Sequence, residues 1–467
     1  MKTLSGHVHI VGIGGAGMSG IARVLLARGV QVSGSDAKES RRLTALAPLG
    51  ADVYVGHDSH RMLQSGQPDV LVISTAISPE NVEVKAAVAA GIPILNRASA
   101  LAELMTDATG ISVAGTHGKT TTTSMLTVIL QQAGLDPSFV IGSEMNESGS
   151  NAHQGTGSLF VAEADESDGT FLLLPSTAAI VTNVEPDHLN YWGSFAKLEQ
   201  AFVDFVVAHA SDSGFAVVCG DDSGSKRIAQ LARESADNVI TYGTSLDSDA
   251  VLTLLPSGGV GANFTITYRG EVHGPIQLVV PGAHNALNAT AAFIVAVELG
   301  CTPKQAIAGL VAFTGTHRRF EFRGEVSKVR VFDDYAHHPT EIEAVLTAAR
   351  TVANGGRVLV AFQAHHFYRT ALFSKEFGQA LGIADFVVVL EVFAPGETPI
   401  PGASGSVMAS NVPLPQDRVV FEPSWSAVPA VLANEARSGD IIMTLGAGDI
   451  GMMCPQILDL LQQRSTL

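Results

Sequence analysis

Apolar runs of strand length alternate with segments of helical period along almost the whole chain. A strand that is buried on both faces reads as a continuous apolar run, and parallel strands need a crossover, usually a helix, between them. The pattern therefore predicts α/β domains built on parallel sheets. At 467 residues the chain is also too long for a single core, so we expect several domains.

The apolar runs form three blocks joined by short connections. In the second block, short alternating segments between residues 250 and 281, with a turn at Ser257–Gly259, predict a small antiparallel addition. We predict three α/β domains, over residues 1–107, 108–320 and 321–467. The first and third are expected to be Rossmann-like, and the central one to be a P-loop-type ATPase domain that includes the antiparallel addition.

Composition narrows the classes of partner. The formal net charge of −17 argues against a nucleic-acid partner, because neutralising phosphates needs a basic surface. The three cysteines stand far apart without metal-ligand or redox spacing, which is typical of core residues in a reducing compartment. The sequence contains no uninterrupted apolar run of about 18 residues and no signal-peptide pattern before its first strand. We expect a cytoplasmic protein without a membrane span, and its oligomeric state stays open.

The first glycine-rich loop, Gly12–Gly17, follows an apolar strand and opens a helix. Glycines in this G-x-G-x-x-G pattern let the backbone approach a pyrophosphate, whose charge the helix N-terminus stabilises. Asp36, at the end of the second strand, is placed to accept hydrogen bonds from a ribose. Taken alone, the loop indicates a nucleotide diphosphate and leaves open which one; a tight turn without a ligand is the alternative.

A second loop, Gly115–Thr120, also lies between a strand and a helix. It departs from the P-loop pattern because Val113 stands where the first glycine is expected. The chemistry nevertheless fits ATP: the glycines free amides for phosphate oxygens, Lys119 places an ammonium on the β- and γ-phosphates, and Thr120 offers a hydroxyl to Mg²⁺. This loop is the strongest functional signal in the sequence.

Acidic and imidazole side chains follow the next two strands of the second block. Glu163 ends the strand Leu159–Glu163, at the edge of the sheet where ligands bind. We predict that it is the first metal ligand and not part of a solvated acidic turn. His188 follows the next strand, and we expect it beside Glu163, at a neighbouring strand end, as a second ligand or as the group that orients a metal-bound water.

The third block contains two further polar loops, each after a strand. Residues 333–340 combine two carboxylates with His337 and His338, which a capping role alone does not explain. Residues 363–369 hold two more histidines and Arg369. The basic pair Arg318–Arg319 precedes this block and could reach a γ-phosphate, although isolated basic pairs are usually solvated.

Together these motifs resemble the Mur ligase family over essentially the whole chain, in the same order. The resemblance is closest to the branch that joins L-alanine to UDP-N-acetylmuramate in peptidoglycan synthesis. The stretches that resemble the family are GIGGAGMSG from Gly12, GTHGKTTTTS from Gly115, EADESDGTF from Glu163, TNVEPDHLNYWG from Thr182, HNALNATAA from His284, RRFEFRG from Arg318, DDYAHHPTEI from Asp333 and LGAGDI from Leu445.

The resemblance implies ATP and Mg²⁺ as cofactors, and UDP-N-acetylmuramate and L-alanine as substrates. It also implies a cleft between domains that close during turnover. The residues it implies for ATP are Gly115, Thr116, His117, Gly118, Lys119, Thr120, Thr121, Asn285, Asn288, Arg319 and Asp334; those for the metal are Thr120, Glu163 and His188. Those for the substrates are Gly14, Gly15, Ala16, Gly17, Met18, Asp36, Ser74 and Arg369.

The resemblance further implies that an acyl phosphate forms first and that the amine of L-alanine then attacks it. Lys119, His188 and Arg319 are the expected catalytic residues, with His337 or His338 as the general base. The chain departs from the family at His366, where arginine is usual, so Arg369 takes the expected contact to a carboxylate or phosphate. Some relatives carry a carbamylated lysine; Lys197 is the nearest lysine, and nothing in the sequence assigns it that role.

Three alternative functions stay open at this point. A nicotinamide-dependent dehydrogenase would explain the first loop and Asp36 but leaves Lys119 without a role. A P-loop ATPase acting as a conformational switch would hydrolyse ATP without a carboxylate acceptor. Within the family, a ligase that recycles a whole murein tripeptide is the nearest competitor.

Overall fold

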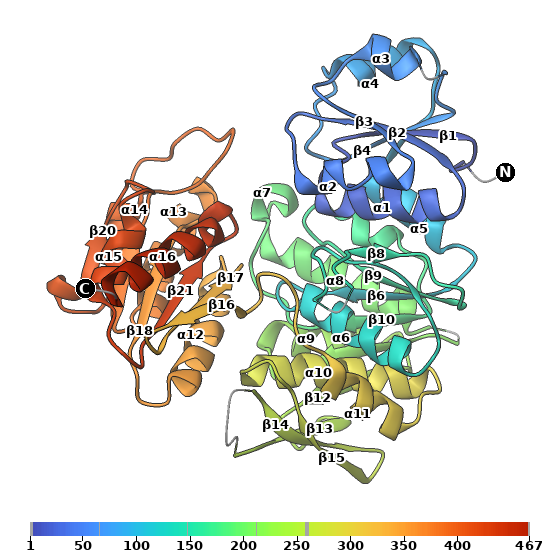
Figure 1. Cartoon of the computed structure of the whole chain (residues 1–467). Coiled ribbons are helices and arrows are strands. Elements are labelled where there is room, and N and C mark those ends of the chain that lie inside the picture. Colours follow the sequence, from blue (N-terminus) through green and yellow to red (C-terminus); the bar gives the residue numbers. More distant parts are fainter. Residues whose placement is uncertain (1–2, 65, 147, 212, 257–260, 466–467) are drawn as a thin grey trace. The chain divides into compact units, whose positions relative to one another are not determined.

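The computed structural model describes the whole chain except residues 1–2, 65, 147, 212, 257–260 and 466–467 (Figure 1). The turn expected at Ser257–Gly259 therefore lies outside the described residues. Contacts divide the chain into two compact units, which are described separately. The first comprises residues 1–253, 264–276 and 287–313, and the second comprises residues 254–263, 277–286 and 314–467.

The N-terminal sheet has five parallel strands in the order β3-β2-β1-β4-β5. Alternate residues face opposite sides: Val70 and Val72 pack in one hydrophobic cluster with α1 and α5, and Leu71 packs in another with α3 and α4. Helices on both faces confirm the Rossmann-like prediction. The elements are β1 (His7–Val11), α1 (Ala16–Ala27), β2 (Gln31–Asp36), α2 (Arg41–Thr44), β3 (Asp52–Val55), α3 (Ser59–Gln64), β4 (Val70–Ile73), α4 (Val82–Ala89), β5 (Ile94–Asn96) and α5 (Arg97–Met105).

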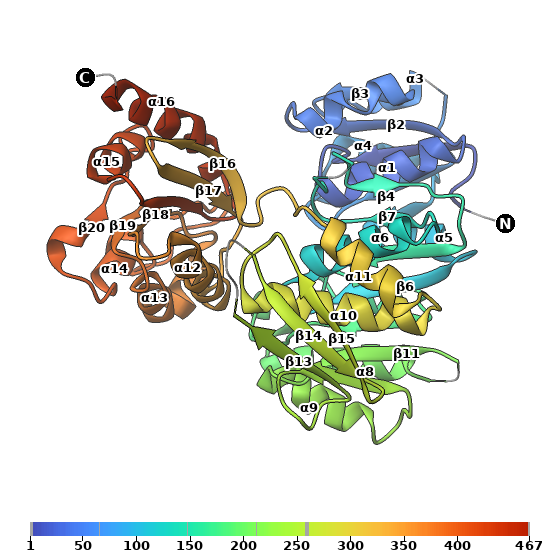
Figure 2. The same ribbon diagram turned by 60° about the horizontal axis from the view of Figure 1, so that its bottom comes forward.

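The central sheet is mixed and has ten strands, in the order β15-β14-β13-β12-β11-β10-β6-β9-β7-β8. Strands β13 to β15, the predicted addition, continue this sheet beyond β12 and form no separate sheet (Figure 2). The strands are β6 (Thr109–Ala114), β7 (Ser138–Val140), β8 (Ala152–His153), β9 (Leu159–Glu163), β10 (Ala178–Val181), β11 (Phe215–Cys219), β12 (Val239–Gly243), β13 (Ala250–Leu255), β14 (Asn263–Tyr268) and β15 (Glu271–Gln277).

Helix α6 begins at Lys119, within the second glycine loop, and ends at Gln132, which confirms that a helix follows this loop. It is buried although its first turns are polar, because hydroxyls bond carbonyls of the preceding turn: Thr123 Oγ1 donates to Lys119 O (2.8 Å) and Thr127 Oγ1 donates to Thr123 O (2.8 Å). The helix thereby holds the second glycine loop against the core. The other helices here are α7 (Leu189–Trp192), α8 (Phe195–His209), α9 (Ser223–Ala232), α10 (Ala283–Glu298) and α11 (Pro303–Ala312).

The second unit contains a mixed sheet of six strands, in the order β16-β17-β21-β18-β19-β20, in which only the β16–β17 pair is antiparallel. Helices α12 and α13 pack on one face, and α15 and α16 pack on the other. The elements are β16 (Glu321–Val326), β17 (Val329–Asp334), α12 (Pro339–Ala353), β18 (Val358–Phe362), α13 (Phe367–Leu381), β19 (Phe386–Val389), α14 (Gly405–Ser410), β20 (Val419–Phe421), α15 (Val428–Glu435), β21 (Ile441–Leu445) and α16 (Cys454–Ser465).

The α/β class and the three sheets agree with the sequence prediction. Within the described part of the chain, every helix falls short of the length and hydropathy that a membrane span requires.

Candidate active site

The loop between β6 and α6 needs glycine at two positions. Gly115 and Gly118 have φ angles of 130° and 80°, which side-chain-bearing residues rarely adopt. A Cβ added at Gly115 would lie 2.1 Å from Thr182 Oγ1, and one at Gly118 would lie 2.7 Å from Asn288 Oδ1. The loop therefore packs directly against the end of β10 and against α10, which brings Asn288, one of the predicted ATP ligands, to the loop.

Residues just after β10 fix the backbone of this loop. Thr116 N donates to Asn183 O (2.9 Å), and His117 N donates to Asn183 Oδ1 (2.8 Å). Thr182 Oγ1 donates to His117 O (2.5 Å). Strand β10 ends at Val181, so Thr182 and Asn183 lie beyond the sheet pairing and bind the loop.

Lys119 lies between loop carbonyls and a buried carboxylate. Its Nζ donates to Gly115 O (2.6 Å) and Thr116 O (3.1 Å), and lies 2.8 Å from Glu166 Oε2. Burial alone would lower the pKa of Lys119, but Glu166 and the neighbouring carboxylates raise it above its usual value. Lys119 is therefore held as an ammonium at the start of α6, where a helix N-terminus also favours phosphate.

Glu166 is a functional candidate that the sequence analysis missed. Its side chain is 1% exposed, and burial raises its pKa although Lys119 opposes the shift. The signal was present in the EADESD stretch, but one sequence does not tell which of four carboxylates turns inward.

Glu163 and Thr120 come together as predicted for a metal site. Thr120 Oγ1 donates to Glu163 Oε1 (3.0 Å), while Gly142 N donates to Glu163 Oε2 (2.7 Å). A carboxylate and a hydroxyl are the hard oxygen ligands that Mg²⁺ prefers. These two residues therefore fit a magnesium ion beside the phosphate-binding loop.

The predicted position of His188 needs a correction. Glu163 and His188 were predicted at neighbouring strand ends, but β6 lies between β9 and β10 in the sheet. The two residues thus follow strands on opposite sides of the strand that precedes the phosphate-binding loop. His188 has a left-handed φ of 52°, and its backbone N donates to Asp187 Oδ1 (2.8 Å).

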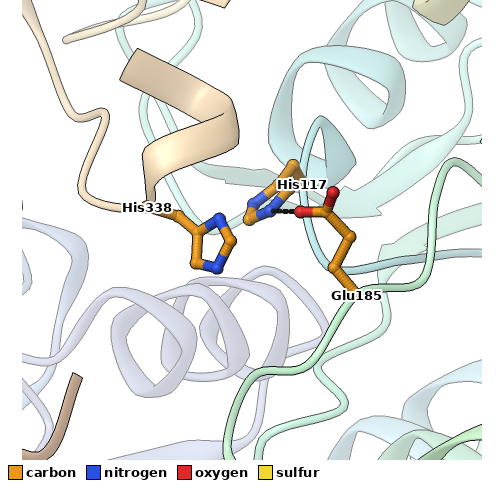
Figure 3. A group of neighbouring side chains, drawn as sticks. All are labelled: His117, Glu185 and His338. Carbon is orange, nitrogen blue, oxygen red and sulfur yellow. Dashed lines mark hydrogen bonds and ion pairs between the residues drawn. The ribbon is translucent and has the colours of Figure 1, made fainter. Parts of the chain in front are cut away.

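His117 has a defined partner within the first unit. Its Nε2 lies 3.0 Å from Glu185 Oε2, and Figure 3 shows this hydrogen bond between the loop and the segment after β10. The backbone N–H of Glu185 donates to Thr116 Oγ1 (2.9 Å). Glu185 was not among the predicted site residues, although it lies in the same motif, TNVEPDHLNYWG, as His188.

Asp36, the last residue of β2, binds the backbone of the first glycine loop. Gly14 N donates to Asp36 Oδ2 (2.9 Å), so in this structure Asp36 binds the loop backbone; its predicted contact with a ribose stays a prediction. Ala16 O accepts from Asn151 Nδ2 (2.7 Å), which joins the loop to the central domain. Met18 is buried, at 3% exposure, and its predicted contact with the substrate stays a prediction.

A cavity of about 230 Å³ connects the two predicted binding regions of the first unit. Gly17 from the first glycine loop and Glu163 from the metal region both line it. Arg97, which the sequence analysis missed, lines the cavity as well and donates from Nη2 to Asp165 Oδ2 (2.9 Å). The cavity therefore places the Arg97 guanidinium among residues of the first glycine loop and Glu163, the predicted metal ligand.

In the second unit, the adjacent residues Arg318 and Arg319 make different contacts. Arg318 donates to Asp333 Oδ2 (2.8 Å) and to the carbonyls of Gly446 (2.6 Å) and Gly448 (2.7 Å), so it holds the fold together. The guanidinium of Arg319 lies over the Tyr335 ring, 5.4 Å from its centroid. The Arg318 guanidinium also lies over this ring, 5.1 Å from its centroid, so the hydrogen bonds to Asp333, Gly446 and Gly448 are what distinguish Arg318. The predicted ATP contact of Arg319 stays a prediction.

Asp334 is buried at the end of β17. It accepts from Phe320 N (2.7 Å) and Ala336 N (2.7 Å), and burial raises its pKa to about 6 although Arg319 opposes the shift. Glu341 Oε2 accepts from His337 N (2.9 Å), and this hydrogen bond orders the start of α12. His338, the N-cap residue of that helix, is 4% exposed.

Arg369 is 1% exposed and is among the largest fully buried side chains of the described residues. Its Nη1 donates weakly to His365 O (3.4 Å). His366, which replaces the usual arginine, pairs through Nδ1 with Glu397 Oε1 and has a φ of 72°.

The other predicted ligand contacts lie at the ends of elements. Asn285 Nδ2 donates to Pro281 O (2.7 Å) at the start of α10. Ser74 directly follows β4, and Thr121 is buried in the first turn of α6.

Family models match all three parts of the chain. The Mur ligase family catalytic domain matches residues 7–109, the Mur ligase middle domain matches residues 113–296, and the Mur ligase glutamate ligase domain matches residues 318–448.

The chain belongs to the Mur ligase family.

Full-length relatives of this Mur ligase are close in sequence. It is 56% identical over 460 residues to the UDP-N-acetylmuramate–L-alanine ligase of Acidothermus cellulolyticus, covering 98% of this chain and 96% of the relative. It is 50% identical over 462 residues to the enzyme of that name from Mycolicibacterium smegmatis, covering 97% and 94%.

Solved structures agree with the fold. The UDP-N-acetylmuramate–alanine ligase of Thermotoga maritima is 27% identical and superimposes with a TM-score of 0.81, covering 99% of this chain and all of that one. A murein peptide ligase from Psychrobacter arcticus gives a TM-score of 0.71 at 25% identity, over 98% of each chain. The Mur ligase fold therefore extends over the whole chain.

Proposed function

We propose that this Mur ligase joins L-alanine to the carboxylate of UDP-N-acetylmuramate at the expense of ATP, in the synthesis of peptidoglycan precursors. One observation supports this most strongly: relatives named UDP-N-acetylmuramate–L-alanine ligase are 46–56% identical to the chain over 97–98% of its length. The arrangement of the phosphate-binding loop and of Glu163 supports the same reaction.

In the first step, the substrate carboxylate oxygen attacks the γ-phosphorus of ATP and the bond to the ADP oxygen breaks, which gives an acyl phosphate. Lys119, already an ammonium between Gly115 O and Glu166, neutralises charge on the transferring phosphoryl group. Thr120, Glu163 and His188 would hold Mg²⁺, which supplies further positive charge to the phosphate oxygens. Backbone amides of the loop bind the remaining oxygens.

In the second step, the amine nitrogen of L-alanine attacks the acyl carbon, and the bond to the phosphate oxygen breaks. The amine must lose a proton, and His337 or His338 is the proposed base. Arg369 is the proposed contact to a substrate carboxylate or phosphate.

The remaining ligand contacts follow the same assignment. We assign the sugar nucleotide to the first glycine loop with Asp36 and Ser74. The proposed ATP contacts outside the phosphate-binding loop are Asn285, Asn288, Arg319 and Asp334.

The decisive assay measures ADP release with each substrate omitted in turn. We expect ADP formation only when the UDP-sugar, ATP and a divalent cation are all present, and amide formation only with L-alanine. Full-rate ADP release without the UDP-sugar would refute the proposal. A murein tripeptide that competes better than L-alanine would instead assign the chain to the tripeptide-recycling reaction.

Lys119→Ala provides the matching variant. It is expected to abolish turnover, because among the described residues Lys119 is the cation that binds the loop carbonyls and Glu166 together. The affinity for the UDP-sugar should stay within about twofold, since its proposed contacts lie in the N-terminal domain. Lys197→Ala is the control, because Lys197 is exposed on α8. Retained turnover in Lys119→Ala would remove the loop from the mechanism.

The proposed domain boundaries, after residues 107 and 320, fall in connections between elements: the first between α5 and β6, the second just before β16. Limited proteolysis at these connections tests them. A cytoplasmic location is part of the proposal, since nucleotide precursors and ATP are found there.

A further inference from the structure

A buried carboxylate in the N-terminal domain forms a network that the proposed reaction does not use. Glu83, from α4, is 0% exposed. Its Oε2 accepts from Ser35 Oγ (2.5 Å), and its Oε1 accepts from Tyr54 OH (2.6 Å) and Asp58 N (3.0 Å). The four groups come from β2, β3, the segment after β3 and α4, so the network joins one face of the sheet to the helix that covers it.

This carboxylate is held in its ionised form. Burial alone would raise the pKa of Glu83, but the His9 imidazole 3.7 Å away and the hydrogen bonds from Ser35 and Tyr54 bring it down to about 2. A buried ionised group is costly unless its partners are fixed in place. The geometry of those partners is therefore well defined.

The network ends on one imidazole at the protein surface. His57 Nδ1 lies 2.8 Å from Ser35 Oγ and 3.4 Å from Glu83 Oε2. Ser35 has one hydroxyl hydrogen and donates it to Glu83, so its oxygen accepts the hydrogen on His57 Nδ1. This fixes the ring, whose side chain is 22% exposed. Nε2 forms no hydrogen bond with any residue in the described part of the chain.

His57 stands at the ligand-binding edge of the N-terminal sheet. It follows β3, whose last residue, Val55, pairs with Asp36, and Gly56 N donates to Asp36 O (2.8 Å). The backbone oxygen of Ser35 accepts from Gly12 N (2.8 Å) and Ile13 N (3.0 Å). Ser35 therefore holds the glycine loop with its carbonyl and His57 with its side chain. Ligands of parallel α/β sheets bind at this carboxyl edge.

We propose that His57 contacts the nucleoside diphosphate of the sugar nucleotide through Nε2, and that Glu83 is a positioning residue that holds His57 for this contact. The inference deepens the proposed function, since it rests on a sugar nucleotide binding at the first glycine loop. It adds a residue from the segment after β3 to a site otherwise built from the loop, Asp36 and Ser74.

His57→Gln tests the contact, with His60→Gln as the control. His60 is exposed on α3, three residues away. We expect His57→Gln to raise the KM for UDP-N-acetylmuramate by about tenfold or more, the effect of losing one hydrogen bond to a ligand in a polar site. The KM for ATP and for L-alanine should not change, and His60→Gln should resemble the wild type. An unchanged KM for the UDP-sugar would overturn the proposal.

Inhibition by UDP locates the contact on the ligand. UDP lacks the sugar and its lactyl carboxylate, so its competitive inhibition constant should rise by the same factor as the KM. A UDP inhibition constant that does not change, with a raised KM, would place His57 on the sugar and refute the nucleotide assignment.

A double-mutant cycle tests whether Glu83 acts through His57. Glu83→Gln alone should raise the KM for the UDP-sugar, but in a His57→Gln background it should add no further increase. Two factors that multiply would show a general structural role and overturn the positioning role. If Glu83→Gln does not fold, Ser35→Ala replaces it in the cycle, because it removes the group between the carboxylate and the ring.

The two proposals fail in different ways. If the wild type forms no ADP that depends on the UDP-sugar, the proposed function fails. Calorimetric titration of the full-length chain with UDP still measures the His57 contact in that case. If the wild type is active and His57→Gln binds UDP as tightly as the wild type does, only the His57 inference fails.

Discussion

Replacing Gly115 by alanine tests whether the phosphate-binding loop is fixed by contact with the neighbouring strand. Two costs add. The φ of 130° at Gly115 lies in a region that other residues avoid, at a cost of about 1–3 kcal/mol. The new Cβ would also lie 2.1 Å from Thr182 Oγ1 and 2.9 Å from Thr182 N. Backbone must therefore shift, which adds about 1–3 kcal/mol.

Gly134→Ala is the matched control, because it isolates the backbone cost. Gly134 lies just after α6, the helix that Gly115 precedes. Its φ is 78°, and a Cβ there would meet nothing within 4 Å. We expect it to lose about 1–2 kcal/mol. The two costs at Gly115 sum to about 2–6 kcal/mol, so this variant should lose about 1–4 kcal/mol more than the control.

Urea unfolding followed by tryptophan fluorescence measures the difference. The chain has two tryptophans, and a Trp425→Phe background leaves Trp192, whose Nε1 donates to Glu166 O (3.0 Å) beside the loop. The Gly115 variant should also lose turnover, because Gly115 O accepts from Lys119 Nζ (2.6 Å). Equal losses of stability in the two variants, within about 1 kcal/mol, would refute the contact argument.

Three further predictions concern hydrogen bonds and buried thiols. Asn151→Ala removes the hydrogen bond to Ala16 O and should cost about 1–3 kcal/mol and raise the KM for the UDP-sugar; a normal KM would separate this bond from binding. Hydrogen bonds lower the pKa of Glu321 from 4.5 to about 2 against the effect of burial, so its contribution is complete above pH 4.5 and is lost as the pH falls toward 2. Glu321→Gln should cost about 3 kcal/mol at pH 7 and little at pH 2, measured by urea midpoints, and an equal cost at both would contradict it. Burial raises the pKa of each cysteine thiol, so iodoacetamide should label the folded chain far more slowly than the chain in urea.

Much of the local structure is determined by short stretches of sequence. The span of α6, from Lys119 to Gln132, follows from a glycine turn and a helical period, and both are local. The chemistry of the phosphate-binding loop is local for the same reason, since its amides, ammonium and hydroxyl lie within six residues. The family resemblance was also visible because its motifs are short and retain their order.

Tertiary structure alone decides which of these local pieces meet. The chain order of strands does not state their order in a sheet, so the sequence analysis placed Glu163 and His188 on neighbouring strands, whereas β6 lies between them. Arg318 and Arg319 are adjacent in sequence, yet Arg318 stabilises the fold by donating hydrogen bonds to the carbonyls of Gly446 and Gly448, which are distant in the sequence.

The same reason explains why Glu166, Arg97 and His57 were not assigned roles from the sequence, although Glu166 lies within one of the motifs. Their significance depends on partners 22 to 68 residues away, and a single sequence contains no record of such contacts. The sequence by itself determined the α/β class, the two glycine loops and the kind of ligand each suits. Burial and strand order, which arise only when distant segments pack, determined which charged side chains stand beside those loops.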